Sequence, residues 1–213
     1  MASHHDCWQC GTPDAGSLFC RYCNSLQAPT PDYYVFLGLP RRLAVDPAIL
    51  QKQFYAMSRM LHPDRYTRRS EQEKRYSLEA SSILNDAYRV LRDPIARAEY
   101  VLREAGFEIG EQRSKDVPPE LLEEVFELNM ALDELRAGDS EVLPQLQESR
   151  HNFKLMLARI DSVLEEHFQR HDGQQDVASR RAVLEQIRNV LHRRRYISNL
   201  VSEVDKQLSS RNA

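Results

Sequence analysis

Residues 46–66 of the 213-residue chain read DPAILQKQFYAMSRMLHPDRY and predict a helix that ends in an exposed loop. Asp46 followed by Pro47 has the pattern of an N-cap residue and a first-turn proline, so a helix is expected to begin there. Apolar residues then recur at helical spacing on one face, at Leu50, Phe54, Met57 and Leu61. Pro63 disfavours helical geometry in the preceding residue, so the helix should end before it and present Asp64 on a loop.

A second amphipathic helix is predicted after this loop, with apolar residues at Ala80, Ile83, Leu84, Ala87 and Leu91. Residues 33–39 predict a short helix that precedes the pair. Two antiparallel helices joined by a basic loop with the tripeptide His62-Pro63-Asp64 resemble the J-domain. J-domains are the modules through which co-chaperones stimulate the ATPase of DnaK-type chaperones. The alternative is an ordinary helix-loop-helix in which the tripeptide is incidental.

Charge is unevenly distributed along the chain, although the formal net charge is only −3. Basic residues outnumber acidic ones in residues 49–75, whereas residues 120–148 are strongly acidic with Arg136 as their one base. This asymmetry indicates two protein partners with opposite charge preferences. No apolar run reaches the ~20 residues of a membrane span and no signal peptide is recognisable, so a soluble protein without a membrane partner is expected.

The four cysteines lie in two Cys-x-x-Cys pairs near the N-terminus: Cys7, Cys10, Cys20 and Cys23. Two such turns can direct four thiolates at one centre and predict a structural site for one zinc ion. Gly11 and Asn24 follow the pairs and could supply the tight backbone geometry of such turns. Two disulfides, a redox-active dithiol and an iron centre are alternatives. The segment has too few basic residues to predict a nucleic-acid partner.

Three long helices are predicted in the second half of the chain. The first opens at Pro118-Pro119 and carries a bundle seam at Leu121, Val125, Leu128, Leu132 and Leu135. The second is expected over residues 141–171, and the third follows Gly173. Short glycine-marked turns between them predict an antiparallel three-helix bundle.

The predicted fold is therefore all-α, with a helical hairpin and a three-helix bundle preceded by a small zinc-binding knuckle module. The predicted boundaries are a tetracysteine segment at 1–28, a J-domain at 32–106, a linker at 107–117 and the bundle at 118–213.

The first bundle helix carries a second apolar row outside its seam, at Leu122, Phe126 and Met130. Acidic residues flank this row. One seam should suffice for packing in a three-helix bundle, so the second row is a candidate docking patch. The alternative is that both rows are core because the helix is sandwiched, and the pattern favours neither.

The stretch RDPIARAEYVL at residues 92–102 is more specific than the tripeptide. Together with the J-domain features and the acidic bundle, it resembles the HscB family of co-chaperones in iron–sulfur cluster assembly, over the chain from Asp32 onward. The tetracysteine segment is similar to that of the longer members, which are typical of eukaryotes. The resemblance implies a protein without enzymatic activity that binds a DnaK- or HscA-type chaperone and an IscU-like cluster scaffold.

The resemblance also implies site residues. Chaperone contacts are expected at His62, Pro63, Asp64, Lys52, Arg59 and Arg65. Scaffold contacts are expected at Leu122, Phe126, Glu127, Met130, Glu134 and Tyr196. Met130 departs from the better-known bacterial members, which have an acidic residue there.

The expected location is the cytoplasm for a bacterial protein, or the mitochondrial matrix for a eukaryotic one whose transit peptide is absent from this sequence. Two rival functions stay open at this point. One is a general folding co-chaperone with unfolded clients, and the other is an oxidoreductase that uses the cysteine pairs.

Overall fold

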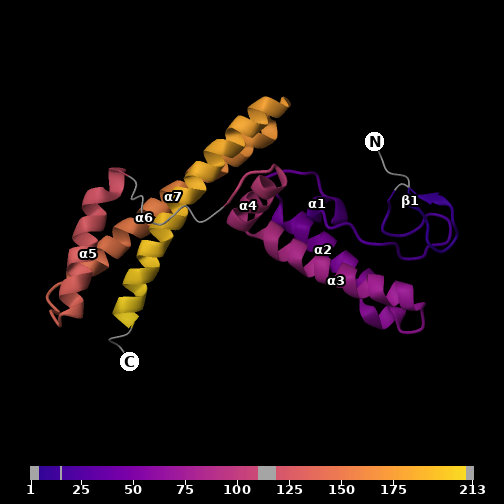
Figure 1. The fold of residues 1–213 in the computed structure, drawn as a ribbon, viewed down its shortest axis with the longest axis horizontal. Helices are drawn as coiled ribbons and strands as arrows, with labels where there is room; N and C mark the ends of the chain where they lie inside the picture. The colour runs from indigo at the N-terminus through magenta and orange to yellow at the C-terminus, as the bar shows by residue number, and fades with distance from the viewer. Residues whose placement is uncertain (1–4, 15, 110–118, 210–213) are drawn as a thin grey trace. The chain divides into compact units, whose positions relative to one another are not determined.

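The computed structural model describes residues 5–14, 16–109 and 119–209. The chain divides into two compact units, Met1–Tyr100 and Val101–Ala213 (Figure 1). Helices dominate both units, as predicted, and the strands of the described residues are two residues long each. None of the described helices combines the length and the apolar character that a membrane crossing requires.

The first unit begins with an antiparallel pair of strands, β1 (His5–Asp6) and β2 (Pro13–Asp14), around the first cysteine pair. The short helix α1 (Tyr33–Phe36) follows, and the side chain of Asp32 caps it. This helix is shorter than the predicted residues 33–39. The chain turns at Gly38, which adopts a left-handed φ of +63° that suits glycine.

The helices α2 (Pro47–Leu61) and α3 (Glu71–Arg92) form the predicted hairpin (Figure 1). Asp46 caps α2 by accepting hydrogen bonds from the N–H groups of Ala48 and Ile49. The predicted apolar face of α2 is directed inward, and Phe54 stacks on Tyr88 of α3 with 4.3 Å between ring centroids. The 3-10 helix η1 (Pro63–Tyr66) lies in the connecting loop.

Helix α4 (Pro94–Glu104) contains most of the stretch at residues 92–102. Arg97 is buried and donates hydrogen bonds to the carbonyls of Leu43 and Leu91. The ring of Tyr100 stacks on Tyr33 with 4.6 Å between centroids, and its hydroxyl accepts a hydrogen bond from the Tyr33 N–H. The arginine and tyrosine of this stretch therefore stabilise the first unit by tying its loop and its first helix to α4.

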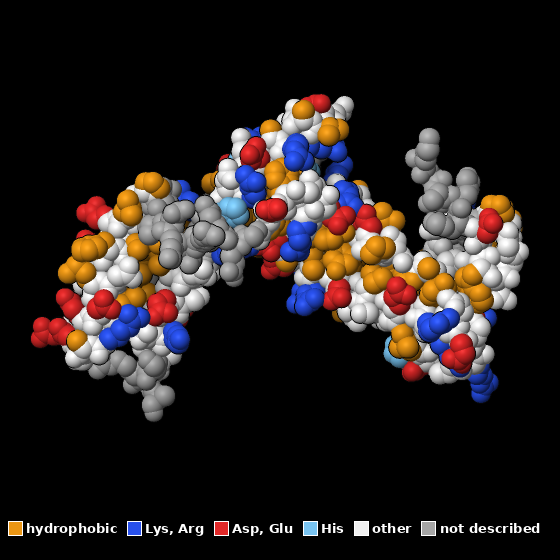
Figure 2. All heavy atoms as spheres, viewed as in Figure 1, with side chains coloured by type: hydrophobic (Ala, Val, Ile, Leu, Met, Phe, Trp, Pro, Cys, Tyr) orange, Lys and Arg blue, Asp and Glu red, His pale blue; other side chains and the backbone are white. Residues whose placement is uncertain are grey.

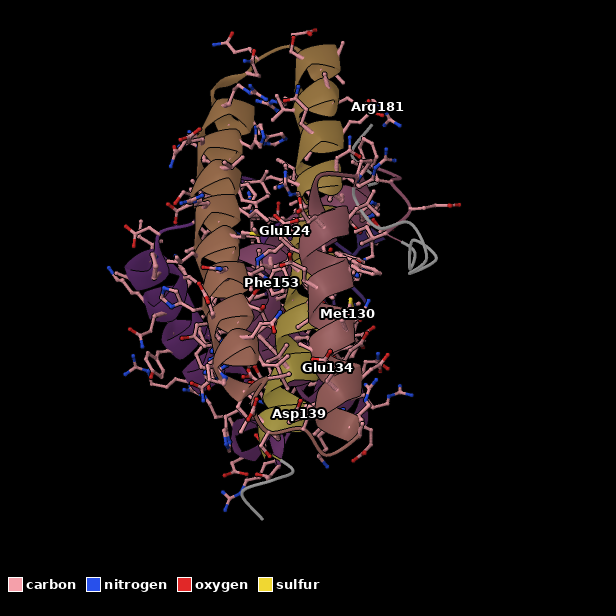
Figure 3. The ribbon with its side chains drawn as sticks, turned by 90° about the vertical axis from the view of Figure 1, so that its left-hand side faces the viewer. Glu124, Met130, Glu134, Asp139, Phe153 and Arg181 are labelled. Atoms are coloured by element: carbon pink, nitrogen blue, oxygen red, sulfur yellow. The ribbon has the colours of Figure 1, made fainter. Side chains whose placement is uncertain are left out.

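The second unit is a bundle of α5 (Leu122–Arg136), α6 (Leu143–Gly173) and α7 (Val177–Ser209), with the 3-10 helix η2 (Pro119–Leu121) before α5. The long helices α6 and α7 pack along each other, and α5 packs beside α6. The predicted seam of α5 is buried throughout, and Phe153 of α6 is buried between the helices (Figure 3). An ion pair of 3.0 Å between Arg136 and Glu203 joins α5 to α7.

The segment after α4 also packs against the bundle. The guanidinium groups of Arg181 and Arg188 both lie close to the ring of Phe107, with 4.7 and 5.5 Å from the two Cζ atoms to the ring centroid. Arg181 donates a hydrogen bond to the Ala105 carbonyl. Phe107 is the first residue of the predicted linker, and residues 110–117 of that linker lie outside the described residues.

Candidate functional site

The four cysteine sulfurs converge on one point. The Sγ atoms of Cys7 and Cys23 are 3.6 Å apart, and those of Cys10 and Cys20 are 3.7 Å apart. The four sulfurs lie within 4.8 Å of one another. A tetrahedral ion with bonds of ~2.3 Å to sulfur requires sulfur–sulfur distances of about 3.8 Å, so the geometry fits a zinc-sized ion.

The two cysteine pairs have the same backbone structure. In the first, Cys7 accepts the Gly11 N–H at its carbonyl and the Gln9 N–H at its sulfur, at 2.8 and 3.4 Å. In the second, Cys20 accepts the N–H groups of Asn24 and Tyr22 in the same way, at 2.9 and 3.4 Å. Gly11 and Asn24 both adopt left-handed φ values, +69° and +56°. These two repeated turns, residues 7–12 and 20–25, are called the first and second knuckles below.

The thiols of this cluster cannot all ionise independently. Burial raises the pKa of Cys7, but hydrogen bonds from Ser25 and from the backbone of Cys10 and Gln9 outweigh it and lower the pKa to about 6. Backbone hydrogen bonds lower the pKa of Cys20, but burial and the neighbouring thiols outweigh them and raise the pKa to about 11. A cation at the centre would stabilise all four thiolates together, so the donor set suits a metal ion.

The first knuckle also contacts α3, which the sequence did not predict. The Trp8 ring meets Tyr76 edge to face with 6.4 Å between centroids, and its Nε1 donates to the Leu26 carbonyl at 2.8 Å. Trp8 is therefore fixed both to the second knuckle's flank and to the helical hairpin.

The tripeptide His62-Pro63-Asp64 leaves α2 at its C-terminal end, as predicted. His62 has an extended ψ of 128°, and its Nδ1 accepts the Asp64 N–H at 3.3 Å. The Asp64 side chain is 85% exposed and lies 3.5 Å from His62 Nδ1. A carboxylate is thus presented to solvent on a turn whose backbone is held by the preceding histidine.

Side chains beyond the tripeptide hold the last turn of α2. The Leu61 carbonyl accepts hydrogen bonds from the hydroxyls of Ser77 and Ser81, at 2.7 and 3.2 Å. The Met60 carbonyl accepts the Tyr66 hydroxyl at 3.2 Å. These carbonyls at the helix end have no partner within the helix, so the three hydroxyls satisfy them. Sequence reasoning missed these residues, because a serine in a helix gives no signal of a carbonyl across the hairpin.

The predicted basic residues are exposed on the same unit. Lys52 and Arg59 are seven positions apart and share a face of α2, and Arg65 lies on η1. Arg65 donates to the Arg59 carbonyl at 3.3 Å, which brings it back toward α2. Tyr55, 53% exposed, lies between Lys52 and Arg59 on this face and was not predicted. The sequence feature that could have identified Tyr55 is an aromatic residue outside the apolar stripe of this helix.

The second apolar row of α5 is exposed. Leu122, Phe126 and Met130 are 55%, 65% and 50% exposed, so the alternative that this row is core is excluded. The exposed Glu127 and Glu134 extend the same stripe, and Figure 3 shows Met130 and Glu134 one turn apart on α5. Figure 2 shows hydrophobic and acidic side chains together over α5. The docking row is defined as Leu122, Phe126, Glu127, Met130 and Glu134.

Tyr196 comes from a different helix, α7, where it is half-buried. Burial raises the pKa of its hydroxyl. A phenol in such a position has an apolar ring against the protein and a polar end that can meet solvent or a partner.

Two family models match most of the chain. Residues 32–100 match the DnaJ domain, and residues 117–205 match the HSCB C-terminal oligomerisation domain.

Curated relatives carry the same family name. The chain is 29% identical over 204 residues to the human iron-sulfur cluster co-chaperone protein HscB, covering 93% of this chain and 80% of that protein. It is 33% identical over 143 residues to a co-chaperone protein HscB homolog of Aromatoleum aromaticum, covering 66% of this chain and 79% of that protein.

Solved structures agree with these relatives. The crystal structure of human co-chaperone protein HscB matches with a TM-score of 0.72 and 28% identity, over 95% of this chain and 98% of that one. Chaperone HscB from Vibrio cholerae shares the fold, with a TM-score of 0.64 over 84% of this chain and 99% of that one. The chain, with its J-domain and its C-terminal helical bundle, belongs to the HscB family of co-chaperones.

Proposed function

We propose that this co-chaperone stimulates the ATPase of a DnaK- or HscA-type chaperone and delivers to it the scaffold protein of iron–sulfur cluster assembly. Residues 32–106 would act as the J-domain and residues 118–213 as the scaffold-binding domain. The name of the human relative, an iron-sulfur cluster co-chaperone, supports this assignment. The chain itself would carry out no covalent chemistry, and hydrolysis would take place in the chaperone.

The chaperone contact is proposed at His62, Pro63, Asp64, Lys52, Arg59 and Arg65. The exposed Asp64 carboxylate would accept charge-assisted hydrogen bonds from a basic group of the chaperone, and these depend strongly on geometry. His62 and Pro63 would maintain that geometry. The exposed basic residues would meet an acidic surface, where complementary charge mainly accelerates encounter and excludes wrong partners.

The scaffold contact is proposed at the docking row of α5, with Tyr196 of α7 as an additional contact. The support is an exposed apolar stripe with acidic neighbours on a helix whose buried seam is complete without it. Apolar anchors surrounded by polar residues are typical of protein–protein interfaces. A folded scaffold with an apolar patch and basic neighbours would complement this row.

We further propose that Cys7, Cys10, Cys20 and Cys23 hold one zinc ion, which would supply folding free energy to the knuckles. The sulfur separations and the matched knuckle turns support a closed four-sulfur site. Iron is the competing ion, because four cysteines also bind iron. Elemental analysis of the purified chain would distinguish them, and zinc at one equivalent is the expected result.

The observation that carries the proposed function is that the chain presents two different exposed surfaces, the Asp64 loop in one unit and the docking row in the other. The test is the steady-state ATPase rate of the chaperone with the full chain, measured with and without the folded scaffold. Stimulation is expected with the chain alone and should rise further when the scaffold is added. If the scaffold adds nothing to the stimulation and unfolded polypeptides reduce it by competing for the co-chaperone, the protein would instead be a general folding co-chaperone.

A further inference from the structure

Ser25 contacts sulfur atoms from both knuckles. Its Oγ lies 3.1 Å from the Sγ of Cys23 and 3.5 Å from the Sγ of Cys7. Cys23 belongs to the second knuckle and Cys7 to the first, so one hydroxyl connects ligands that are 16 positions apart. The Ser25 residue is 94% buried, at 6% exposure, and water has little access to compete for the hydroxyl.

Gln27 determines the direction of this hydrogen bond. Its Nε2 lies 2.9 Å from the Ser25 carbonyl oxygen and 2.8 Å from Ser25 Oγ. A carbonyl oxygen can only accept, so the amide nitrogen must face it, and its second hydrogen is then available to Oγ. Because Oγ accepts from Gln27, its own hydrogen is free to point at the sulfurs.

Thr12 occupies the equivalent position of the first knuckle and differs from Ser25. Its Oγ1 lies 3.0 Å from the Sγ of Cys10, within the same knuckle, and the pair is exposed. The backbone frame of the two knuckles is alike, since Cys7 N–H donates to the Thr12 carbonyl as Cys20 N–H donates to the Ser25 carbonyl, at 2.9 and 3.0 Å. The chain therefore contains an internal control, with one hydroxyl that joins the two knuckles and one that does not.

We propose that Ser25, oriented by Gln27, is a positioning residue that holds Cys7 and Cys23 at their metal-binding separation and thereby determines how tightly the metal is retained. This inference rests on the proposed binding of a metal by the four cysteines. Residues that hydrogen-bond to metal ligands orient them, and their loss typically costs about 10- to 100-fold in metal affinity. The buried, bridging hydroxyl should therefore contribute more than the exposed hydroxyl of Thr12.

The experiment uses the full chain with Ser25→Ala, Thr12→Ala and Gln27→Leu substitutions, and Ser25→Thr as the variant that keeps the hydroxyl. Zinc affinity is measured by competition with a chromogenic chelator, and the visible spectrum of the Co²⁺-loaded chain reports the ligand geometry. Ser25→Ala should lose about tenfold or more in zinc affinity and change the Co²⁺ spectrum. Thr12→Ala should lose less zinc affinity than Ser25→Ala, and the loss in Gln27→Leu should be intermediate. Ser25→Thr should keep most of the zinc affinity of the unsubstituted chain.

Two outcomes distinguish a failure of the positioning role of Ser25 from a failure of the proposed metal site. If the unsubstituted chain binds one zinc ion and Ser25→Ala binds it as tightly as Thr12→Ala does, the positioning role is wrong while the zinc site stands. If the unsubstituted chain binds neither zinc nor Co²⁺ through its sulfurs, the metal site itself is wrong. The far-ultraviolet circular dichroism of each variant, dominated by helices that carry their own cores, shows whether a loss of affinity reflects global unfolding.

Discussion

The loop of the first unit and the docking row of the second present opposite kinds of surface. Asp64 is a single exposed carboxylate on a turn. Hydrogen bonds at His62 and at the end of α2 fix the backbone of this turn. The docking row carries three exposed apolar side chains, Leu122, Phe126 and Met130, one turn apart on a regular helix that is held by its buried seam. Recognition by the loop should therefore depend on one geometry, whereas recognition by the row should depend on summed apolar burial.

The largest expected effect is at Asp64. Replacing Asp64 with Asn removes the negative charge while keeping the shape, and stimulation of the chaperone ATPase should be lost while scaffold binding is unchanged. Glu71→Gln is the matched control, because that carboxylate belongs to the same unit and its side chain is also 85% exposed. Steady-state ATPase assays on both variants decide the point. Equal stimulation by Asp64→Asn and the unsubstituted chain would remove the loop from the proposed mechanism.

The docking row should show a smaller, cumulative effect. Substituting Leu122, Phe126 and Met130 together by Ala should weaken scaffold binding by about tenfold or more, as expected when clustered apolar anchors are truncated. The melting temperature should change little, because these side chains are already exposed. Calorimetric titration with the scaffold measures the affinity.

Leu128→Ala is the control for the row, since Leu128 lies on the same helix and is buried in the seam. Loss of the Leu128 side chain should reduce the free energy of unfolding by about 2–5 kcal/mol. If the triple variant is destabilised as much as this control, the row contributes to the core in solution and the contrast with the loop disappears.

Loss of a hydrogen bond that fixes the end of α2 next to the loop should have a third, more modest effect. Ser77→Ala removes the buried 2.7 Å hydrogen bond to the Leu61 carbonyl and leaves that from Ser81. The free energy of unfolding should fall by about 1 kcal/mol, and half-maximal stimulation should require more co-chaperone. Ser82→Ala, at an exposed position of the same helix, should change neither. If Ser77→Ala stimulates the ATPase at the same co-chaperone concentrations as the unsubstituted chain, the loop keeps its geometry without this hydrogen bond.

Metal removal should have the smallest effect on the two surfaces. Chelation should unfold the knuckles, because a structural zinc ion supplies on the order of 10 kcal/mol to such a segment, while the helices keep their own cores. Scaffold affinity and most of the helical circular dichroism signal should persist. Global loss of the helical signal on chelation would show instead that the contact between Trp8 and Tyr76 supports the hairpin.

Local patterns determined much of this protein from the sequence alone. Asp46 before Pro47 identified the start of α2, and Pro63 its end, because caps and prolines act on the nearest backbone groups. The two Cys-x-x-Cys pairs predicted one four-sulfur cluster, and Gly11 and Asn24 predicted tight backbone geometry after each pair, since ligand spacing and backbone geometry are also local. The apolar seam of α5 followed from its spacing.

Tertiary structure alone decided what each face meets. Periodicity defines the faces of a helix but does not identify the neighbour of a face, so the exposure of Leu122, Phe126 and Met130 required the packed bundle. Ser25 and Ser77 act through partners 18 and 16 positions away, and Arg97 reaches a carbonyl 54 positions away. Hydrogen bonds across such separations depend on how the chain returns on itself, and no local pattern in the sequence records that path.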